Sequence, residues 1–430
     1  MNRTLRTSRI PELDGLRGIA IAMVVIWHYF VSPTIAHRGT PLFYTLALAR
    51  LSWTGVDLFF VLSGFLIGGI LLDARGATNY FSVFYTRRFF RIVPIYFAVL
   101  LLLPDLTAFG EWTQHGNFRW FLGSSTPWYS YWTFTQNFWM AHAGDFGGYG
   151  LWMTWSLAVE EQFYLTLPLL LRLMPPRWFL RCVLLGICTA PILRMTIHFF
   201  WPDNWLRAFV LMPCRADALL LGVLAAILIR DVRWQERIQG SKLLFPILLA
   251  VFSAGIVFLN VQSPGPDSPL MLEVGYTWLA LSYTLFLLFA LTRPNSFMSQ
   301  ALRSKWLGSL GLIAYGTYLF HQPMQWLLFA YFWGGAPRLL NGYTLITTLS
   351  ALVLTLATAR FSWRFIENPL IQFGHRSDYQ FAASTEKNLS PSVPEVVGRK
   401  VGSSFAASRE IPDERNKEEA RENVSGGRFS

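Results

Sequence analysis

Long apolar stretches alternate with short polar segments along the first 374 residues of the chain. A helix needs roughly 20 mostly apolar residues to cross a bilayer, and a sliding window finds about ten such stretches. The predicted spans lie near residues 13–32, 52–72, 89–105, 151–173, 180–200, 207–229, 243–260, 273–292, 307–331 and 343–370. This pattern predicts an all-α polytopic integral membrane protein.

The composition supports this fold class and excludes others. Of the 430 residues, 53% are hydrophobic and only 14% are charged. A soluble domain cannot bury that much apolar surface, so the excess is expected to face lipid. A disordered chain and a disulfide-stapled secreted domain are both excluded by the same figures.

The net charge of +11 belongs entirely to the apolar part of the chain. Residues 375–430 hold nine basic and nine acidic residues, whereas residues 1–374 hold 27 basic and 16 acidic ones. We therefore predict two parts: a transmembrane domain over 1–374 and a disordered polar cytoplasmic tail over 375–430. Basic residues between apolar spans indicate membrane topology, so no nucleic-acid partner is expected.

The positions of the basic residues predict the orientation. If the N-terminus is inside, the inner segments carry 16 Lys and Arg and the outer segments carry five. Cytoplasmic loops are enriched in basic residues, so this bias favours an even number of spans with both termini in the cytoplasm.

The first apolar span carries a cation and an imidazole on one face. Arg17 and His28 are eleven residues apart, and eleven helical steps of about 100° return to within about 20° of the same direction. The rise over that length is about 16 Å, which places Arg17 near the inner surface and His28 near the outer one. A lone buried histidine is usually structural, but ionisable groups in lipid are costly, so both are candidate functional residues.

Carboxylates occur in two spans that enter the membrane from outside. Asp57 lies in the outer third of the second span, as either a catalytic group or an ion-pair partner. Glu160 and Glu161 stand inside the fourth span, roughly 100° apart around the helix, so only one can face a given partner well. We favour Glu160, one turn from Ser156, with a structural salt bridge as the alternative.

Further charges stand at the inner surface and inside the sixth span. Arg88 and Arg91 lie one turn apart at the start of the third span. They are either ordinary positive-inside anchors or a clamp for phosphates, which the fork of guanidinium donors suits. Arg215 and Asp217 form a charge pair in apolar surroundings and predict a buried network that holds the bundle together.

The longest predicted outer segment, residues 104–150, is unusually aromatic. It contains Trp112, Trp120, Trp128, Trp132 and Trp139. Such rings form belts at the membrane interface, which is one interpretation. The other is a stacking surface for a sugar or a lipid-linked acceptor.

The candidate residues fall at two depths in the membrane. The candidate acid and base groups lie in the outer half: His28, Asp57 and Glu160. The candidate phosphate ligands lie at the inner mouth: Arg17, Arg88 and Arg91. A phosphate-bearing donor from the cytoplasm is therefore expected to dock inside and present its reactive end towards His28.

These segments together resemble the acyltransferase-3 family, whose members are membrane acyltransferases that modify bacterial surface polysaccharides and some small molecules. The resemblance rests on six segments in order along the chain: Leu13–Gly18 with the Arg17/His28 pair, Gly55–Phe65, Arg88–Arg91, Trp155–Tyr164, Tyr318–Pro323 and Glu367–Pro369. No single segment is specific, but the set spans residues 12–370.

The resemblance implies transfer of an acyl group, commonly acetyl, from acyl-coenzyme A to a hydroxyl of a cell-surface carbohydrate or its lipid-linked precursor. It implies a multi-pass protein of the bacterial inner membrane, with membrane lipids around it and no metal. The family's essential residues map onto this sequence as follows: His28 and Arg17, the paired arginines Arg88 and Arg91, and the acidic position Glu160.

The expected mechanism places the phosphates of acyl-coenzyme A on the three arginines and uses His28 as the general base. Glu160 or Asp57 is expected to orient the other ring nitrogen of His28. Direct attack on the thioester is the simpler route, although Ser63 or Ser156 could carry a covalent intermediate.

Two alternatives stay open. Many polysaccharide-acting members carry an additional C-terminal extracytoplasmic domain, and residues 375–430 are too short and polar for one. This keeps open an acyltransferase for a small molecule such as an antibiotic or a lipid precursor. A transporter that exports an anionic or acylated molecule along the same polar axis is the second alternative.

Overall fold

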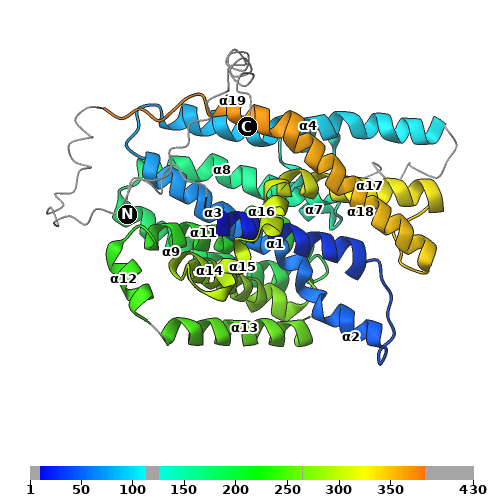
Figure 1. Ribbon diagram of the computed structural model, residues 1–430, viewed down its shortest axis with the longest axis horizontal. Coiled ribbons are helices and arrows are strands. Elements are labelled where there is room, and N and C mark those ends of the chain that lie inside the picture. The colour runs from blue at the N-terminus through cyan, green and yellow to red at the C-terminus, as the bar shows by residue number, and fades with distance from the viewer. Residues whose placement is uncertain (1–9, 113–124, 242, 264, 383–430) are drawn as a thin grey trace, which may run out of the picture. The chain divides into compact units, whose positions relative to one another are not determined.

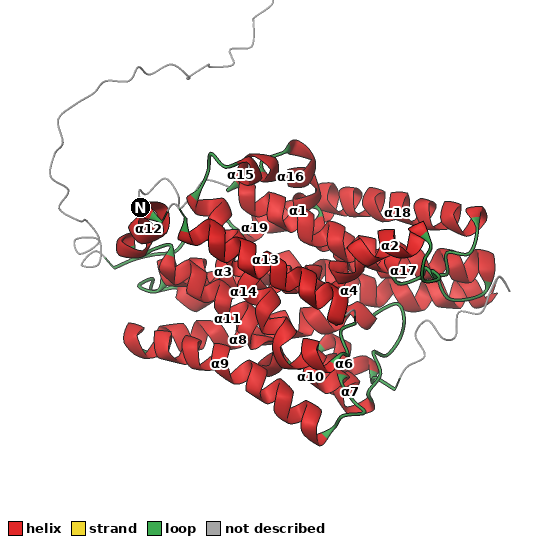
Figure 2. Ribbon diagram, turned by 90° about the horizontal axis from the view of Figure 1, so that it is seen from below, coloured by secondary structure: helices red, strands yellow, loops and turns green. Residues whose placement is uncertain are grey.

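The computed structural model describes residues 10–112, 125–241, 243–263 and 265–382 of the chain. Within these residues the secondary structure is helical, apart from a single isolated β-bridge between Ala77 and Phe381 (Figure 2). The long helices run alongside one another in one general direction, as helices that cross a bilayer together do (Figure 1). The all-α fold class is confirmed.

The helices follow one another closely along the chain. Those before residue 175 are α1 (Pro11–Ile26), α2 (Pro41–Leu48), α3 (Gly55–Ala74), α4 (Tyr80–Trp112), α6 (Trp128–Trp132), α7 (Gln136–Ala143) and α8 (Trp155–Leu173). The middle of the chain forms α9 (Pro176–Phe200), α10 (Leu206–Val210), α11 (Met212–Leu228), α12 (Val232–Gly240) and α13 (Leu244–Gln262). The last group is α14 (Tyr276–Thr292), α15 (Phe297–Leu302), α16 (Lys305–Leu312), α17 (Ala314–Trp333), α18 (Gly342–Ser362) and α19 (Asn368–Gly374).

Eight helical segments within the described residues are long and apolar enough to span a membrane. They are Pro11–Val31, Pro41–Ala74, Tyr80–Leu106, Pro176–Phe200, Leu206–Leu228, Phe245–Gln262, Met271–Thr292 and Gly342–Gly374. Each overlaps one of the ten predicted spans. The chain is thus a polytopic membrane protein.

The two remaining predicted spans coincide with α8 and α17, which have 19 and 20 residues. Both are long enough to cross a bilayer but more polar than the other eight. Helix α8 carries Glu160, Glu161 and Arg172, and α17 carries His321 with two glutamines. The count of ten spans therefore stays a prediction, and both of the helices that differ carry ionisable residues in otherwise apolar segments.

Helices α3 and α11 pack backbone to backbone through interlocking glycines. A Cβ atom placed on Gly64 would lie 1.8 Å from the carbonyl oxygen of Leu219, and one on Gly222 would lie 2.1 Å from that of Val61. Gly68 faces Val223 less closely, because a Cβ atom there would lie 3.1 Å from the Val223 side chain and 3.2 Å from its Cα atom. Small residues at such positions allow two helices to approach closely.

Helix α1 is fixed against the α15–α16 region in the same way. Cβ atoms on Gly15 and Gly18 would lie 2.0 and 2.3 Å from the carbonyl oxygens of Leu302 and Leu307. From the other side, Gly311 faces the carbonyl oxygen of Asp14. These contacts hold α1, and with it Arg17 and His28, in one position in the bundle.

Three π-helical turns interrupt the regular helices of the described residues: η2 (Trp27–Val31), η5 (Met271–Gly275) and η6 (Trp363–Glu367). Such turns widen a helix locally and occur mostly at functional positions. Here η2 carries His28, and η6 carries Glu367. The carbonyl of Leu272 in η5 accepts a hydrogen bond from the buried Arg194.

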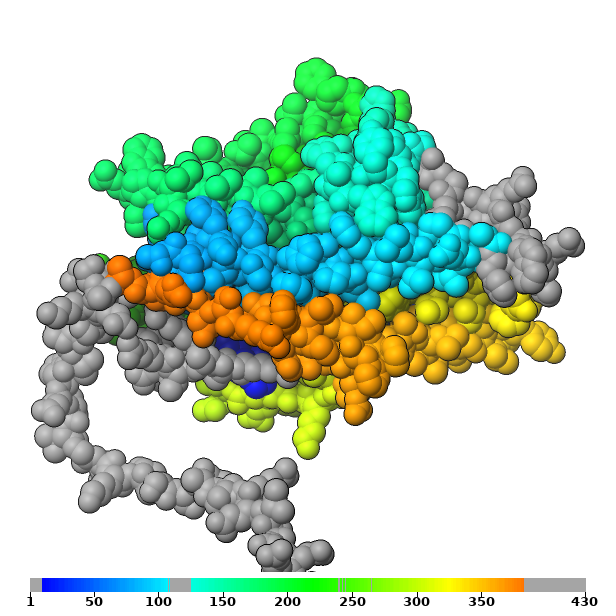
Figure 3. All heavy atoms as spheres, turned by 90° about the horizontal axis from the view of Figure 1, so that it is seen from above, coloured from blue at the N-terminus to red at the C-terminus, as the bar shows by residue number. Residues whose placement is uncertain are grey.

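The end of the described chain lies along α4. Figure 3 shows α19 and the residues after it beside the first half of α4, and Gly374 faces Phe90. Residues 375–382 continue past this contact, where Arg87 pairs with Asp378 at 2.9 Å. The predicted tail boundary at 375 stays a prediction, and residues 383–430 lie outside the described residues.

Candidate active site

A cavity in the middle of the bundle collects most of the polar residues singled out by the sequence. It encloses about 990 Å³ of space not filled by protein atoms, including solvent at its mouth. Its polar lining comes from α1, α3, α4, α8, α17 and η6: Arg17, Ser63, Arg88, Arg91, Ser156, Glu160, Tyr164, Tyr315, Tyr318 and Glu367.

Three arginines from two distant segments line this cavity. Arg17 comes from α1, and Arg88 and Arg91 come from the first three turns of α4. Arg17 has only a long contact to Asp14, 3.5 Å from Nη1 to Oδ1. Among the described residues neither Arg88 nor Arg91 has an ion-pair partner. Guanidinium donors left free inside a cavity form a site for a phosphate or carboxylate.

Glu160 lies on the same cavity wall as the arginines, whereas Glu161 does not line the cavity. The carboxylate of Glu160 accepts a hydrogen bond from the Tyr164 hydroxyl at 3.2 Å, and that hydroxyl also bonds to Ser63. The positive charges of the three arginines are close enough to stabilise the Glu160 carboxylate. Glu160 therefore partly balances the positive charge of the arginines.

A second carboxylate, Glu367, reaches the cavity from η6. Its Oε1 accepts a hydrogen bond from the Ser362 hydroxyl at 2.8 Å, and its residue is buried. The sequence placed Glu367 at the inner surface as part of a closing motif and did not assign it to a site. The π-helical turn puts it on the cavity wall.

Two hydroxyl groups of the cavity lining lie against each other. The Tyr318 and Ser156 hydroxyls lie 2.5 Å apart, and both also approach the carbonyl oxygen of Met153, at 3.0 and 3.2 Å. Neither His28 nor His321 belongs to the cavity lining. The ring of His321 nevertheless lies close to the lining, 5.5 Å from the ring of Tyr318.

His28 and His321 form a hydrogen-bonded pair whose partners assign the tautomers. Nδ1 of His321 lies 2.5 Å from the Tyr318 carbonyl, which can only accept, so this nitrogen carries the proton and Nε2 accepts. Nδ1 of His28 lies 2.9 Å from the Val24 carbonyl and 3.2 Å from Nε2 of His321. The single Nδ1–H of His28 is therefore shared between two acceptors.

This arrangement leaves Nε2 of His28 with a lone pair and no hydrogen-bond partner among the described residues. The His28 side chain is only partly buried, and the Trp152 ring lies 6.0 Å from its ring. An imidazole held at Nδ1 and bare at Nε2 has the geometry that a general base needs, so His28 is a candidate for this role and His321 a candidate positioning residue.

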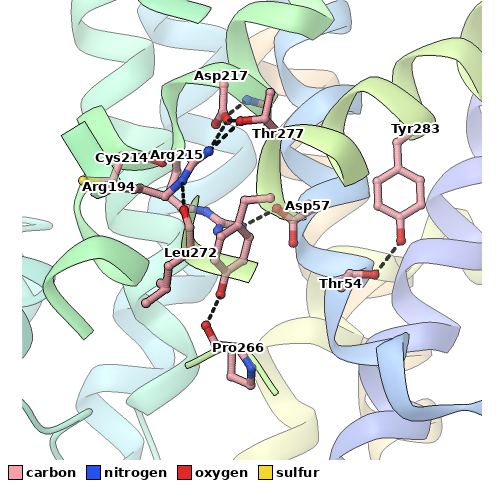
Figure 4. Close-up of polar contacts among 12 residues, drawn as sticks. Thr54, Asp57, Arg194, Cys214, Arg215, Asp217, Pro266, Leu272, Thr277 and Tyr283 are labelled. Atoms are coloured by element: carbon pink, nitrogen blue, oxygen red, sulfur yellow. Dashed lines mark hydrogen bonds and ion pairs between the residues drawn. The ribbon is translucent and has the colours of Figure 1, made fainter. Parts of the chain in front are cut away.

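Asp57 lies outside the cavity lining. It forms a buried ion pair with Arg215 of α11, and both residues are 1% exposed (Figure 4). The Arg215 guanidinium lies over the Tyr276 ring, 4.0 Å from its centroid. Asp57 has no hydrogen bond to His28. Of the two interpretations of Asp57, the geometry favours the ion-pair partner.

The neighbouring charges complete this network. Arg194 of α9 pairs with Asp217 at 2.8 Å, and Asp217 also accepts from Thr277 at 2.7 Å (Figure 4). The buried network predicted from Arg215 and Asp217 is therefore present, but the two do not pair with each other. Residues two positions apart on a helix point roughly 200° apart, so each finds its partner on another helix.

The structure thus brings some candidates together and separates others. Arg17, Arg88, Arg91 and Glu160 share one cavity, while His28 is outside its lining and Asp57 belongs to the buried network. The expected orientation of His28 by Glu160 or Asp57 differs from the geometry, because Nδ1 faces Val24 and His321.

Sequence reasoning assigned no role to His321, Tyr318 or Glu367. Each stands in a segment that the sequence had singled out, and His321 is an unexplained imidazole in an apolar span. His321 contacts His28, and Tyr318 contacts Ser156, each more than 150 positions away in sequence. No local sequence pattern contains such a contact.

Comparison with known proteins identifies one family model, described as "Acyltransferase domain", which matches residues 10–361. The chain is 26% identical over 375 residues to the O-acetyltransferase OatA of Staphylococcus aureus, covering 86% of this chain and 58% of that protein. It is 27% identical over 388 residues to the peptidoglycan O-acetyltransferase OatA of Listeria monocytogenes, covering 87% and 58%. No solved structure matches the chain.

Proposed function

The chain belongs to the acyltransferase-3 family, and on that premise we propose that it is a membrane O-acyltransferase that transfers an acetyl group from acetyl-coenzyme A to a hydroxyl of a cell-wall carbohydrate. The chain spans only 58% of the length of the Staphylococcus aureus and Listeria monocytogenes relatives, which are named as O-acetyltransferases. Its activity, donor and acceptor are therefore proposals, as is its place in a bacterial inner membrane.

The observation that carries the proposal is a cavity lined by three arginines, with the His28–His321 pair next to its Tyr318 wall. Arg17, Arg88 and Arg91 are proposed to bind the phosphates of coenzyme A. The apolar and hydroxyl-bearing wall between them and Tyr318 accommodates the pantetheine arm. The thioester then lies at the end nearest His28.

The chemical step needs one base and no covalent intermediate. The acceptor hydroxyl attacks the thioester carbonyl, and Nε2 of His28 takes the hydroxyl proton as the new C–O bond forms. The C–S bond breaks, and the coenzyme A thiolate leaves and takes the proton back from the imidazolium. His321 and the Val24 carbonyl accept hydrogen bonds from Nδ1–H of His28, and these bonds stabilise the transient imidazolium.

The remaining candidates have positioning roles in this proposal. The Tyr318–Ser156 contact closes the cavity towards His321, so we propose that it opens when the donor is bound. Glu160 holds the Tyr164 hydroxyl and limits the repulsion among the arginines. Asp57 fixes α3 against α11 through Arg215.

The test is transfer by the purified full-length protein. With acetyl-labelled acetyl-coenzyme A and soluble peptidoglycan fragments, we expect ester-linked label on the sugar. Loss of a general base typically lowers the rate by about 100- to 10,000-fold, so His28→Ala is expected to abolish measurable transfer.

The matched control is His37→Ala, because His37 is exposed and outside the site. It is expected to retain the wild-type rate. Wild-type transfer by His28→Ala would contradict the role of His28. A wild-type protein that neither binds nor consumes acetyl-coenzyme A would favour the transporter, and consumption only with a small-molecule acceptor would contradict the carbohydrate.

A further inference from the structure

Aromatic side chains that are not part of the cavity lining gather near His28. The Trp152 ring lies 6.0 Å from His28, 6.1 Å from the Tyr149 ring and 6.1 Å from the Trp326 ring. The Tyr149 and Trp326 rings stack at 4.3 Å, with 23° between their planes. We refer to Tyr149, Trp152 and Trp326 as the aromatic platform.

A glycine-rich loop between α7 and η4 (Trp152–Thr154) presents two rings of the platform. Gly144 and Gly147 adopt φ values of 70° and 80°, which side-chain-bearing residues rarely adopt. The Gly147 amide donates to the Asp145 carboxylate at 3.3 Å and steadies the turn. Tyr149 remains 41% exposed, so the platform is open to a ligand.

The polar edges of the platform face inward. Nε1 of Trp326 donates to the Gln322 amide oxygen at 2.8 Å, and Nε1 of Trp152 is buried with no hydrogen-bond partner in the described part of the chain. Gln325, 1% exposed and one helical turn beyond His321, has a buried amide nitrogen with no partner among the described residues. Buried donors without partners are costly, so a ligand that supplies oxygen atoms would satisfy them.

An interfacial belt accounts poorly for these rings. Belt residues turn their polar edges towards water and their apolar parts towards lipid, as exposed Tyr129 and Trp139 of the same segment can do. The platform has the opposite arrangement: its N–H groups are buried, and its Trp152 ring lies beside a candidate base. A sugar ring fits it, because its C–H face packs on an aromatic ring and its hydroxyls reach nearby donors.

We propose that the aromatic platform is the acceptor subsite, where a sugar ring of the glycan stacks on Tyr149 and reaches Trp152, with its reacting hydroxyl directed to Nε2 of His28. The proposal rests on the proposed function and adds to it the place and the chemistry of acceptor binding. It also explains why His28 lies outside the donor cavity: the base stands between the two substrates.

The test uses Tyr149→Ala in the full-length protein, with Tyr149→Phe as the conservative variant. We expect Tyr149→Ala to raise the KM for soluble peptidoglycan fragments by about tenfold, which corresponds to about 1.4 kcal/mol, and to leave the KM for acetyl-coenzyme A unchanged. Tyr149→Phe keeps the ring and is expected to behave like the wild type. Tyr129→Ala, also an exposed aromatic residue of this segment, is the matched control.

A second measurement separates this proposal from the transfer reaction. Binding of the same fragments without any donor is measured by calorimetry for the wild type, Tyr149→Ala and Tyr129→Ala. Binding lost only in Tyr149→Ala supports a glycan site even if no transfer is found. Equal binding and equal acceptor KM in both alanine variants would overturn the subsite and leave the proposed transfer intact.

Discussion

At the scale of single residues, the pairing of His28 with His321 decides which nitrogen can act. A neutral imidazole has one donor and one acceptor nitrogen, and its neighbours select the tautomer. The Tyr318 carbonyl fixes the tautomer of His321, and His321 with the Val24 carbonyl fixes that of His28. The basic nitrogen of His28 is thereby directed away from its own helix.

Replacing His321 tests this positioning. We expect His321→Leu to lower kcat by about 100-fold and to leave the KM for acetyl-coenzyme A unchanged. This is the smaller end of the rate loss that removal of a general base itself causes, because His28 remains but is no longer oriented. His321→Gln offers a side-chain oxygen as acceptor and is expected to restore part of kcat. Steady-state kinetics of both variants checks this, and equal losses in the two would indicate a purely structural role.

The neighbouring arginines of α4 offer a second test at this scale. Arg88 lines the cavity, whereas Arg87 pairs with Asp378 outside it. We expect Arg88→Gln to raise the KM for acetyl-coenzyme A by at least roughly tenfold, since a charge-assisted bond to phosphate contributes about 1.5–3 kcal/mol. Arg87→Gln is the matched control and is expected to leave that KM unchanged. Equal effects would mean that the cluster acts only through overall charge.

At the scale of elements, glycines set how closely the helices of the site approach. The contacts of Gly64 with Leu219 and of Gly222 with Val61 leave no room for a methyl group between α3 and α11. This close packing also brings the Asp57 and Arg215 side chains into contact. The π-helical turns add local width, so that His28 and Glu367 occupy positions that a regular helix would not give them.

The glycine contact predicts a defined loss of stability. Gly222→Ala places a methyl group 2.1 Å from the Val61 carbonyl oxygen, and overpacking of this kind typically costs about 1–3 kcal/mol. We expect a lower melting temperature for the purified protein in detergent. Gly342→Ala, at the start of α18 with open space around it, is the control. Equal melting temperatures for both variants would contradict the close packing.

At the scale of the whole molecule, the site depends on orientation in the membrane. The proposed donor is cytoplasmic and the proposed acceptor is outside, so the arginine end of the cavity has to face inward. The basic residues of the loops predict this orientation, with both termini inside.

Single cysteines in a cysteine-free background test the orientation. Arg38→Cys is expected to react with a membrane-impermeant maleimide in intact cells, and Arg233→Cys only after permeabilisation. Both positions are exposed and lie between spans, on opposite predicted sides of the membrane, Arg38 in a turn after η2 and Arg233 in α12. The reverse labelling pattern would place the arginines outside and would remove the basis for coenzyme A as the donor.

The sequence by itself determined the fold class, the family and most of the candidate residues. Apolar spans are local features, and charges inside them stand out because lipid makes them costly. Arg17, Arg88, Arg91 and Glu160 were found in this way, and the structure places all four on one cavity.

Only the tertiary structure decided the partners of these residues. It pairs Asp57 with Arg215, His28 with His321 and Tyr318 with Ser156, each across more than 150 positions of sequence. It also stacks Tyr149 on Trp326 and places Trp152 between this stack and His28 in the chain of ring contacts. The physical reason is that helices separated by hundreds of residues meet through close glycine contacts and π-helical turns, whose geometry no periodic pattern along the chain encodes.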